Sequence, residues 1–198
     1  MALINDAELD DLEREFVSRV RGRVLEIGAG DGENFGAFVP GVEWIGLEPD
    51  EKRRAELATR AREWHHASAP LDAHAESIPL PDHSVDAVVG TYVLCSVDDP
   101  AATLAEVRRV LVPGGRVIFV DHVIAPPGTL KRAVQRVATP ISKRVCHGCH
   151  WDRDTERALA DAGFVSGDIR RLRVRSMPFG PVPMLLFDGQ APGGGTLE

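Results

Sequence analysis

A glycine-rich segment between two apolar runs is the feature that most constrains the fold of this 198-residue chain. The apolar run at 23–27 leads into Gly28, Gly30 and Gly32, and the next apolar run ends on Glu48. Glycine lets a backbone bend sharply and lie close against a ligand, because it has no Cβ. The helix that follows points its N–H groups at that ligand, and an acid after the second strand accepts hydrogen bonds from ribose hydroxyls. The pattern predicts a nucleoside-binding α/β unit.

The spacing of the glycines indicates which nucleoside is bound. A dinucleotide fingerprint, G-x-G-x-x-G, needs its third glycine at position 33, where this chain has Glu33. Glu26 stands two residues before the first glycine. The resulting E-x-G-x-G-x-G form resembles the first motif of the class I S-adenosylmethionine-dependent methyltransferases. Two alternatives remain for the glycine segment. It could be a structural turn that binds no ligand, or the turn of a nicotinamide dehydrogenase, which Glu33 disfavours.

Apolar runs alternate with helical periodicity along the chain. This alternation predicts an α/β fold with a doubly wound, mostly parallel sheet, whose ligands bind at the carboxyl ends of the strands. We expect strands at 23–27, 42–47, 71–75, 85–89, 117–120, 169–174 and 182–187. We expect helices at 6–20, 34–38, 51–64, 100–110, 130–137 and 154–162, and a turn at Pro113-Gly114-Gly115.

Two further blocks extend the resemblance to residues 22–124. Residues 73–86 resemble the second and third conserved blocks of small-molecule class I methyltransferases, and residues 111–116 resemble their turn before the fifth strand. This resemblance implies the Rossmann-like seven-stranded sheet of that class, with order 3-2-1-4-5-7-6 and strand 7 antiparallel. It implies a single domain at 1–190, in which 124–151 and the first helix cover the substrate, and a flexible tail at 191–198. The implied cofactor is S-adenosylmethionine, with S-adenosylhomocysteine as product.

The same resemblance implies roles for individual residues. Glu48 would bind the ribose, and residues 74–76 would contact the adenine through a side-chain acceptor and a backbone N–H. The family usually has Asp where His74 stands, so either His74 or Glu76 supplies the acceptor. The backbone near Gly90 and Thr91 would hold the methionine ammonium, with Glu26 as support or as a partner through water. The expected cofactor-binding residues are Glu26, Gly28, Ala29, Gly30, Asn34, Glu48, Pro49, His74, Ala75, Glu76, Gly90 and Thr91.

Three short segments carry a narrower resemblance. Residues 91–97, 121–123 and 148–155 are similar to the methyltransferase-like 7 group of alkyl thiol S-methyltransferases. Vertebrate members of that group are tethered to membranes by an N-terminal apolar segment, which we do not find before the first strand. The resemblance implies methyl transfer to a small-molecule acceptor, with a thiol favoured. The alternatives are an N-methyltransferase for an amine or a phospholipid headgroup, and a protein that binds S-adenosylmethionine without catalysis.

Two side chains are candidates for catalysis. A thiol with a pKa of about 8.5 is a few per cent thiolate at neutral pH, so a modest base or a nearby cation suffices. His122, at the carboxyl end of the fifth strand, is the expected base, or else it only shapes the pocket. Tyr92 follows the fourth strand and would face the methyl group, as pocket wall, hydrogen-bond donor or core residue.

Charge and hydropathy limit the partners and the location. The net charge of −7 opposes binding to nucleic acid, although residues 131–175 hold eleven Lys and Arg against five Asp and Glu. That basic stretch is either a solvated face or a surface for an anionic substrate or headgroup. No signal peptide and no run of about 18 apolar residues is present. We expect a cytoplasmic protein without stable membrane insertion.

The sequence Cys146-His147-Gly148-Cys149-His150 matches several unrelated patterns. C-x-x-C-H is the pattern of haem attachment, half of a zinc site or a redox pair. Haem attachment needs export, and a zinc site needs two more ligands, for which His122 and His150 are the candidates. We expect a structural or pocket-lining role and no metal.

Overall fold

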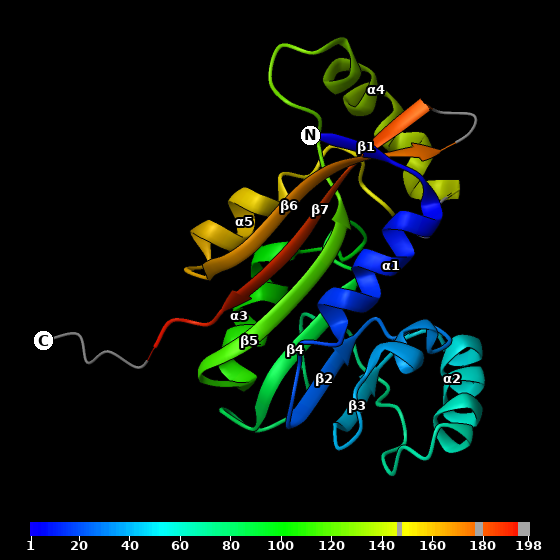
Figure 1. The fold of residues 1–198 in the computed structure, drawn as a ribbon, viewed down its shortest axis with the longest axis vertical. Helices are drawn as coiled ribbons and strands as arrows, with labels where there is room; N and C mark the ends of the chain where they lie inside the picture. Colours follow the sequence, from blue (N-terminus) through cyan, green and yellow to red (C-terminus); the bar gives the residue numbers. More distant parts are fainter. Residues whose placement is uncertain (146–147, 177–179, 194–198) are drawn as a thin grey trace, which may run out of the picture.

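A seven-stranded mixed sheet forms the centre of the computed structural model, which describes residues 1–145, 148–176 and 180–193 (Figure 1). The strands are β1 (Ala2–Ile4), β2 (Arg23–Ile27), β3 (Glu43–Leu47), β4 (Val85–Thr91), β5 (Leu111–His122), β6 (Val165–Ser176) and β7 (Gly180–Gln190). Their order is β1-β6-β7-β5-β4-β2-β3. Only β7 runs antiparallel to its neighbours among these strands.

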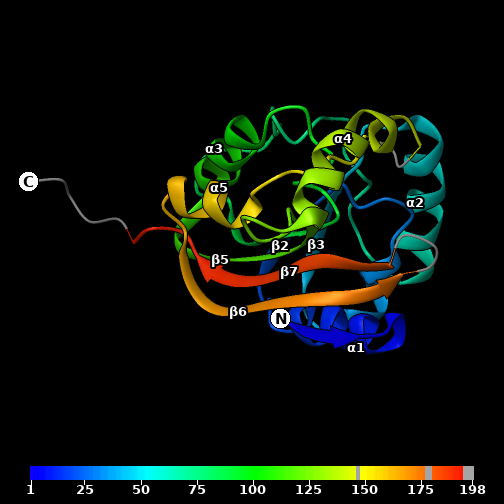
Figure 2. The same ribbon diagram turned by 90° about the horizontal axis from the view of Figure 1, so that it is seen from above.

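Helices cover both faces of this sheet (Figure 2). They are α1 (Asp6–Val17), the 3₁₀ helix η1 (Glu33–Ala37), α2 (Glu51–Glu63), α3 (Pro100–Val110), α4 (Leu130–Val145) and α5 (Thr155–Asp161). Several begin at acidic or amide caps, because such side chains accept hydrogen bonds from the first unpaired N–H groups. Asn5 forms a capping box with Glu8, and Asp99 accepts from two N–H groups of α3. Among the described residues, no helix has the length and apolar content needed to cross a membrane.

The expected fold class is confirmed, except that one predicted strand is absent and another strand, at the opposite edge, completes the sheet of seven. Six strands stand in the predicted order, including the antiparallel strand near 182–187. The predicted strand at 71–75 is wrong, because only Leu71 forms a parallel bridge, to Leu47. This segment follows Pro70 and contains Asp72, Ala73 and Ala75, residue types that are depleted in strands. The seventh strand is instead β1, which pairs with β6 at the opposite edge and is mostly exposed.

Several element boundaries also differ from the predictions. α1 ends at Val17 rather than at residue 20, and α4 continues through Pro140 to Val145 rather than ending at 137. The predicted turn at 113–115 lies inside β5, as an irregularity in its pairing with β4. There Gly114 has φ +75°, a conformation that glycine adopts without strain. Residues 113–115 therefore continue strand β5, although their composition is that of a turn.

Both faces of the sheet are buried by apolar side chains. On one face, Leu25 and Ile27 join a cluster that includes Leu104 of α3 and Leu159 of α5. On the other face, Val24 joins a cluster that includes residues of α1. Strands buried on both faces read as continuous apolar runs, which is why the central strands were recognisable in the sequence. The polar side chains of the site lie where these strands end.

Candidate functional site

A cavity of about 920 Å³ lies at the carboxyl ends of β2, β3, β4 and β5. This volume is within the range of about 300–1,000 Å³ typical of small-molecule sites. Of the predicted site residues, those that line the cavity are Gly28, Glu48, Pro49, His74, Ala75, Glu76, Tyr92 and His122. Its other lining residues include Arg53, Val93, Cys95, Asp98, Lys131, Val134, Gln135, Cys149 and Trp151.

The glycine-rich turn after β2 forms one wall of the cavity. Gly28 and Gly30 both have φ +59°, and a Cβ on Gly28 would come within 2.6 Å of the Val93 side chain. A Cβ on Gly30 would come within 2.6 Å of the Arg53 guanidinium. The N–H of Ala29 donates to the carbonyl of Leu47 at 3.0 Å, which ties the turn to β3. Conformation and space both require glycine at these two positions, and at Gly28 the cavity wall is bare backbone.

Glu48 directly follows β3 and is 4% exposed. Its Oε2 accepts from the N–H of Gly30 at 2.9 Å, and its Oε1 accepts from the N–H of Asp50 at 3.0 Å. These bonds connect the two strand ends and fix the carboxylate at the cavity. Each carboxylate oxygen can accept more than one hydrogen bond, so the group can still accept from a ligand diol.

The 74–76 segment forms the opposite wall. Ala75 is buried, while His74 is exposed at the cavity. Oε1 of Glu76 accepts from the N–H groups of Asp98 at 2.9 Å and Asp99 at 3.3 Å. Glu76 thereby anchors this segment to the start of α3. Which side chain contacts an adenine, His74 or Glu76, stays a prediction.

Glu26 lies behind the glycine turn and is 1% exposed. Its two oxygens accept from Asn34 Nδ2 and Trp44 Nε1, each at 2.7 Å. Asn34 Nδ2 also donates to Thr91 Oγ1 at 3.0 Å. Burial raises the pKa of Glu26 to about 7, against the opposing effect of its two hydrogen bonds. This network braces the ends of β2 and β4 from inside the protein.

Six predicted cofactor residues are thus outside the described cavity lining: Glu26, Ala29, Gly30, Asn34, Gly90 and Thr91. Gly90 is buried in β4, where a Cβ would come within 2.9 Å of the Phe119 ring. Its glycine is required by packing within the sheet. These residues shape the wall from behind, whereas Gly28, Glu48 and residues 74–76 face the cavity.

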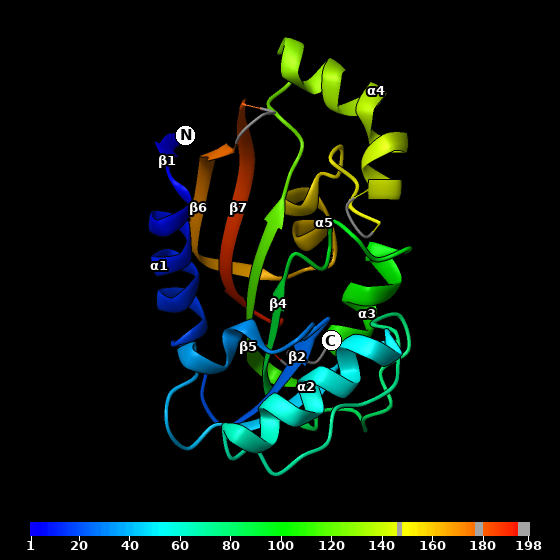
Figure 3. The ribbon, with the colours of Figure 1, turned by 90° about the vertical axis from the view of Figure 1, so that its right-hand side faces the viewer.

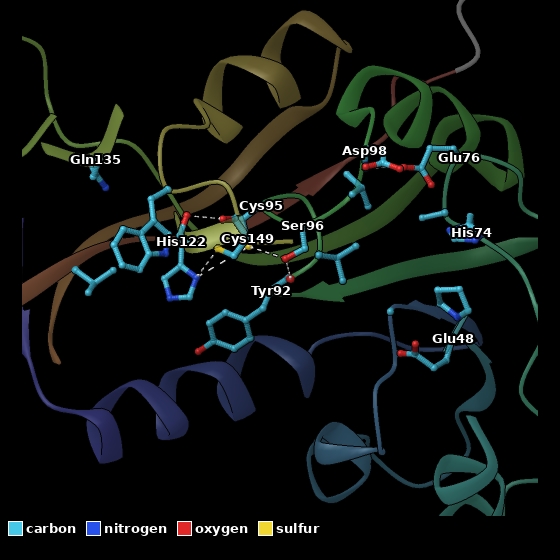
Figure 4. Close-up of a pocket in the computed structure, with 18 of the residues that line it drawn as sticks. Glu48, His74, Glu76, Tyr92, Cys95, Ser96, Asp98, His122, Gln135 and Cys149 are labelled. Carbon is cyan, nitrogen blue, oxygen red and sulfur yellow. Dashed lines mark hydrogen bonds between the residues drawn. The ribbon is translucent and has the colours of Figure 1, made fainter. Parts of the chain in front are cut away.

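Tyr92 and His122 lie together at the other end of the cavity (Figure 4). Tyr92 has φ +59°, which is uncommon for a non-glycine residue and often marks a functional site. Its ring centroid is 5.2 Å from that of His122. The Tyr92 hydroxyl donates to Glu13 of α1. Burial raises the pKa of Glu13, while this hydrogen bond opposes the rise. The first helix was expected to help cover the substrate, but no sequence signal singled out Glu13 as a partner of Tyr92.

Two buried cysteines, Cys95 and Cys149, flank His122. Nδ1 of His122 is 3.6 Å from Cys149 Sγ and 4.0 Å from Cys95 Sγ. A hydrogen bond with Cys149, together with burial, raises the pKa of Cys95 to about 12. Cys149 lines the cavity, whereas Cys146 and His147 of the same C-x-x-C-H sequence lie outside the described residues.

Helix α4 lies beyond the carboxyl end of β5 (Figure 3) and lines the cavity with Lys131, Val134 and Gln135, among other residues. Gln135 is buried, accepts from the N–H of Ala125 at 2.7 Å and donates to the carbonyl of Val123 at 3.1 Å. This side chain holds α4 to the segment that leaves β5. Sequence reasoning placed a cover at 124–151 but singled out neither Gln135 nor Arg53.

Comparison with known proteins identifies the relatives of this chain. The family described as "Methyltransferase domain" matches residues 25–119. Human thiol S-methyltransferase TMT1B is 32% identical over 89% of this chain and 78% of the human protein. Phosphatidylethanolamine N-methyltransferase of Cereibacter sphaeroides is 28% identical over 71% of this chain and 68% of that protein. Geranyl diphosphate C-methyltransferase of Streptomyces coelicolor A3(2), solved with S-adenosyl-L-homocysteine, shares the fold with a TM-score of 0.73 at 16% identity, covering 94% of this chain and 80% of that one.

Proposed function

This chain belongs to the class I S-adenosylmethionine-dependent methyltransferases, in the group that contains the thiol S-methyltransferases TMT1A and TMT1B, and we propose that its acceptor is a small thiol. One observation carries the proposal. A single cavity has Glu48 at one end and His122 at the other, beneath α4. Family membership sets aside the nicotinamide-dependent and non-catalytic alternatives.

The cavity wall fits S-adenosylmethionine. The bare backbone at Gly28 lets a nucleoside lie close, and the oriented Glu48 carboxylate suits its two ribose hydroxyls. We assign direct contact to Gly28, Glu48, Pro49, His74, Ala75 and Glu76. We assign a supporting role to Glu26, Ala29, Gly30, Asn34, Gly90 and Thr91. When bound, this cofactor supplies an electrophilic methyl group on a sulfonium.

His122 and Tyr92 have different roles at the acceptor end. His122 is the group placed to take the proton of an acceptor thiol, and a thiol needs only modest help to ionise. Tyr92 has one hydroxyl hydrogen, and it is donated to Glu13. Its ring, rather than its hydroxyl, therefore faces the acceptor. Tyr92 positions the substrate and narrows the pocket.

The cover excludes water from the reaction. We assign residues 1–190 to one domain, in which 124–151 cover the acceptor end, and 191–198 to a tail. Val134 and Ala138 of α4 give the cover an apolar inner surface, and the Gln135 hydrogen bonds hold it in place. Displacement at carbon is governed by positioning of the reactants and exclusion of water.

An amine acceptor is the second candidate. It is favoured by the Cereibacter sphaeroides relative, which is named for phosphatidylethanolamine, and by Lys131 at the cavity. An ammonium at position 131 suits the phosphate of a headgroup, although it repels the amine that would be methylated. The thiol S-methyltransferases match the chain at higher identity and over more of its length.

The chemistry of the chain supports a cytoplasmic enzyme that does not act on nucleic acid. No disulfide joins the described cysteines, Cys95 and Cys149, as is usual in a reducing compartment. The net charge of −7 disfavours the phosphate backbone of nucleic acids.

An acceptor panel tests the proposal. Purified protein with labelled S-adenosylmethionine is offered small thiols, amines, phenols and vesicles of phosphatidylethanolamine, and S-adenosylhomocysteine is measured. We expect product with thiols, and loss of cofactor binding in Gly28→Val as a control for the site. Product with the amines or vesicles but not with thiols would overturn the thiol assignment in favour of the second candidate.

A further inference from the structure

Three soft ligand atoms meet at the acceptor end of the cavity. Within the described part of the chain, Cys95, His122 and Cys149 form a group whose ligand atoms all lie within 4.8 Å of one another. Cys95 lies in the loop after β4, His122 is the last residue of β5, and Cys149 precedes α5. Figure 4 shows the three side chains converging. The fold, rather than a local motif, brings them together.

The nitrogen–sulfur separations are close to those of ligands around a zinc ion. Zinc lies about 2.3 Å from a thiolate sulfur and about 2.0–2.1 Å from an imidazole nitrogen, in tetrahedral geometry. These bonds require about 3.6 Å between sulfur and nitrogen and about 3.8 Å between two sulfurs. His122 Nδ1 is 3.6 Å from Cys149 Sγ and 4.0 Å from Cys95 Sγ. The two sulfurs lie within 4.8 Å of each other, so an approach of up to about 1 Å between them would complete the ligand set.

The surrounding hydrogen bonds hold both cysteines in place. The Cys95 N–H donates to Asp121 Oδ1 at 3.0 Å, and the Cys95 carbonyl accepts from the His150 N–H at 2.7 Å. The second bond joins the two cysteine segments directly. The Ser142 hydroxyl donates to the Cys149 carbonyl at 2.8 Å. These bonds fix the backbone from which both thiols project, as the surroundings of a metal site must.

Charge and exposure favour a divalent cation. Two thiolates, one neutral imidazole and Zn²⁺ sum to zero, which suits a site where both cysteines are buried. Two thiolates with one imidazole favour zinc over magnesium or calcium, which prefer oxygen ligands. All three residues also line the cavity. Three protein ligands with an open fourth position are the arrangement of catalytic zinc.

We propose that Cys95, His122 and Cys149 bind Zn²⁺, and that its fourth position takes the acceptor sulfur as a thiolate. This inference rests on the proposed function, because it assigns a device for activating a thiol. The acceptor loses its proton to solvent on binding zinc. Its sulfur electron pair then forms the bond to the methyl carbon as the bond from that carbon to the sulfonium breaks, and no oxidant is needed. His122 then acts as a ligand, and the cation takes over the role of the base.

The size of the effect follows from the thiolate population. With a pKa of about 8.5, about 3% of a thiol is ionised at pH 7, whereas a metal-bound thiol is deprotonated outright. Zinc therefore raises the reactive population by up to about 30-fold at pH 7. Turnover of the zinc form is nearly flat between pH 7 and 8. Turnover of the metal-free form rises about eightfold over the same interval.

Metal content and reversible removal test the site. The protein is prepared with a phosphine reductant, and its zinc is measured by mass spectrometry. We expect about one zinc per chain, its loss in Cys95→Ala and Cys149→Ala, and its retention in the matched control Cys146→Ser. Cobalt substitution gives the thiolate-to-metal absorption of a tetrahedral site. Chelator-stripped wild type, restored by added zinc, shows the effect without relying on a variant that misfolds.

The outcomes separate this inference from the proposed function. Wild type that binds no zinc, a Cys95–Cys149 disulfide in place of metal, or zinc lost equally in Cys146→Ser overturns the ligand assignment. Stripped protein that methylates thiols at the full rate overturns the activating role and leaves the thiol acceptor standing. Zinc-loaded protein that binds the cofactor but methylates only amines overturns the proposed function and leaves the metal site standing.

Discussion

Replacing Glu48 by glutamine tests how cofactor binding is built into the strand ends. The side chain is 4% exposed, and each of its oxygens accepts a backbone N–H, from Gly30 at 2.9 Å and from Asp50 at 3.0 Å. Glutamine has the same size but only one acceptor oxygen. Its amide group must therefore face one of these two N–H donors, and one ribose hydroxyl loses its acceptor.

The magnitudes follow from these contacts. A hydrogen bond to a charged group contributes about 1.5–3 kcal/mol, and leaving a buried donor unpaired costs about 1–3 kcal/mol. We expect Glu48→Gln to lower the free energy of unfolding by about 1–3 kcal/mol. Loss of one bond to the ribose weakens binding of S-adenosylhomocysteine by a further 1.5–3 kcal/mol, or about 10- to 150-fold.

Two measurements separate these effects. Titration calorimetry with S-adenosylhomocysteine gives the binding free energy, and urea unfolding without ligand gives the stability. Glu33→Gln is the matched control, because Glu33 is an exposed acid only a few residues from the glycine turn. Binding within about threefold of wild type, in a variant of unchanged stability, would refute the role of Glu48 in both the turn and the ribose site.

Two further predictions concern the pH dependence of stability. Burial raises the pKa of Glu26 from 4.5 to about 7, so between these pH values the carboxyl is ionised in the unfolded chain but protonated in the folded protein, and wild type loses about 3 kcal/mol of stability as pH rises through this range. Glu26→Gln should reduce the difference between the unfolding free energies measured in urea at pH 5 and pH 8, and an unchanged difference would contradict the burial effect. Burial opposes ionisation of Asp188, but hydrogen bonds from Arg116 and Arg19 outweigh this effect and lower the pKa of the carboxyl. The ionised carboxylate therefore stabilises the protein above pH 4, and this stabilisation is lost as pH falls further. Asp188→Asn should lower the free energy of unfolding by about 2 kcal/mol at pH 7, and a deficit that persists undiminished below pH 3 would exclude an ionic origin.

The cover shows where local sequence signals were overridden. Pro140 removes a backbone donor and usually ends or kinks a helix, so the sequence placed the helix end at 137. In the structure α4 continues to Val145, and its buried Gln135 and Ser142 bond to other segments. These tertiary contacts stabilise a helix that propensity alone would end. The predicted strand at 71–75 is the opposite case, because the sequence indicated a strand that the structure does not form. Its apolar pattern was weak, and only Leu71 pairs with a neighbouring strand.

The sequence by itself determined the alternation of strands and helices, the glycine turn and the position of Glu48, whereas the order of six strands followed from the resemblance to class I methyltransferases. The alternation and the turn depend on burial periodicity and turn chemistry, which are properties of neighbouring residues. Only the tertiary structure joined Glu13 to Tyr92 and brought Cys95 and Cys149 to His122. Such pairs come from segments far apart in the chain, and their geometry depends on how helices and loops pack on the sheet. A single sequence does not record that packing, so at the acceptor end it predicted His122 and Tyr92 but not the side chains that surround them.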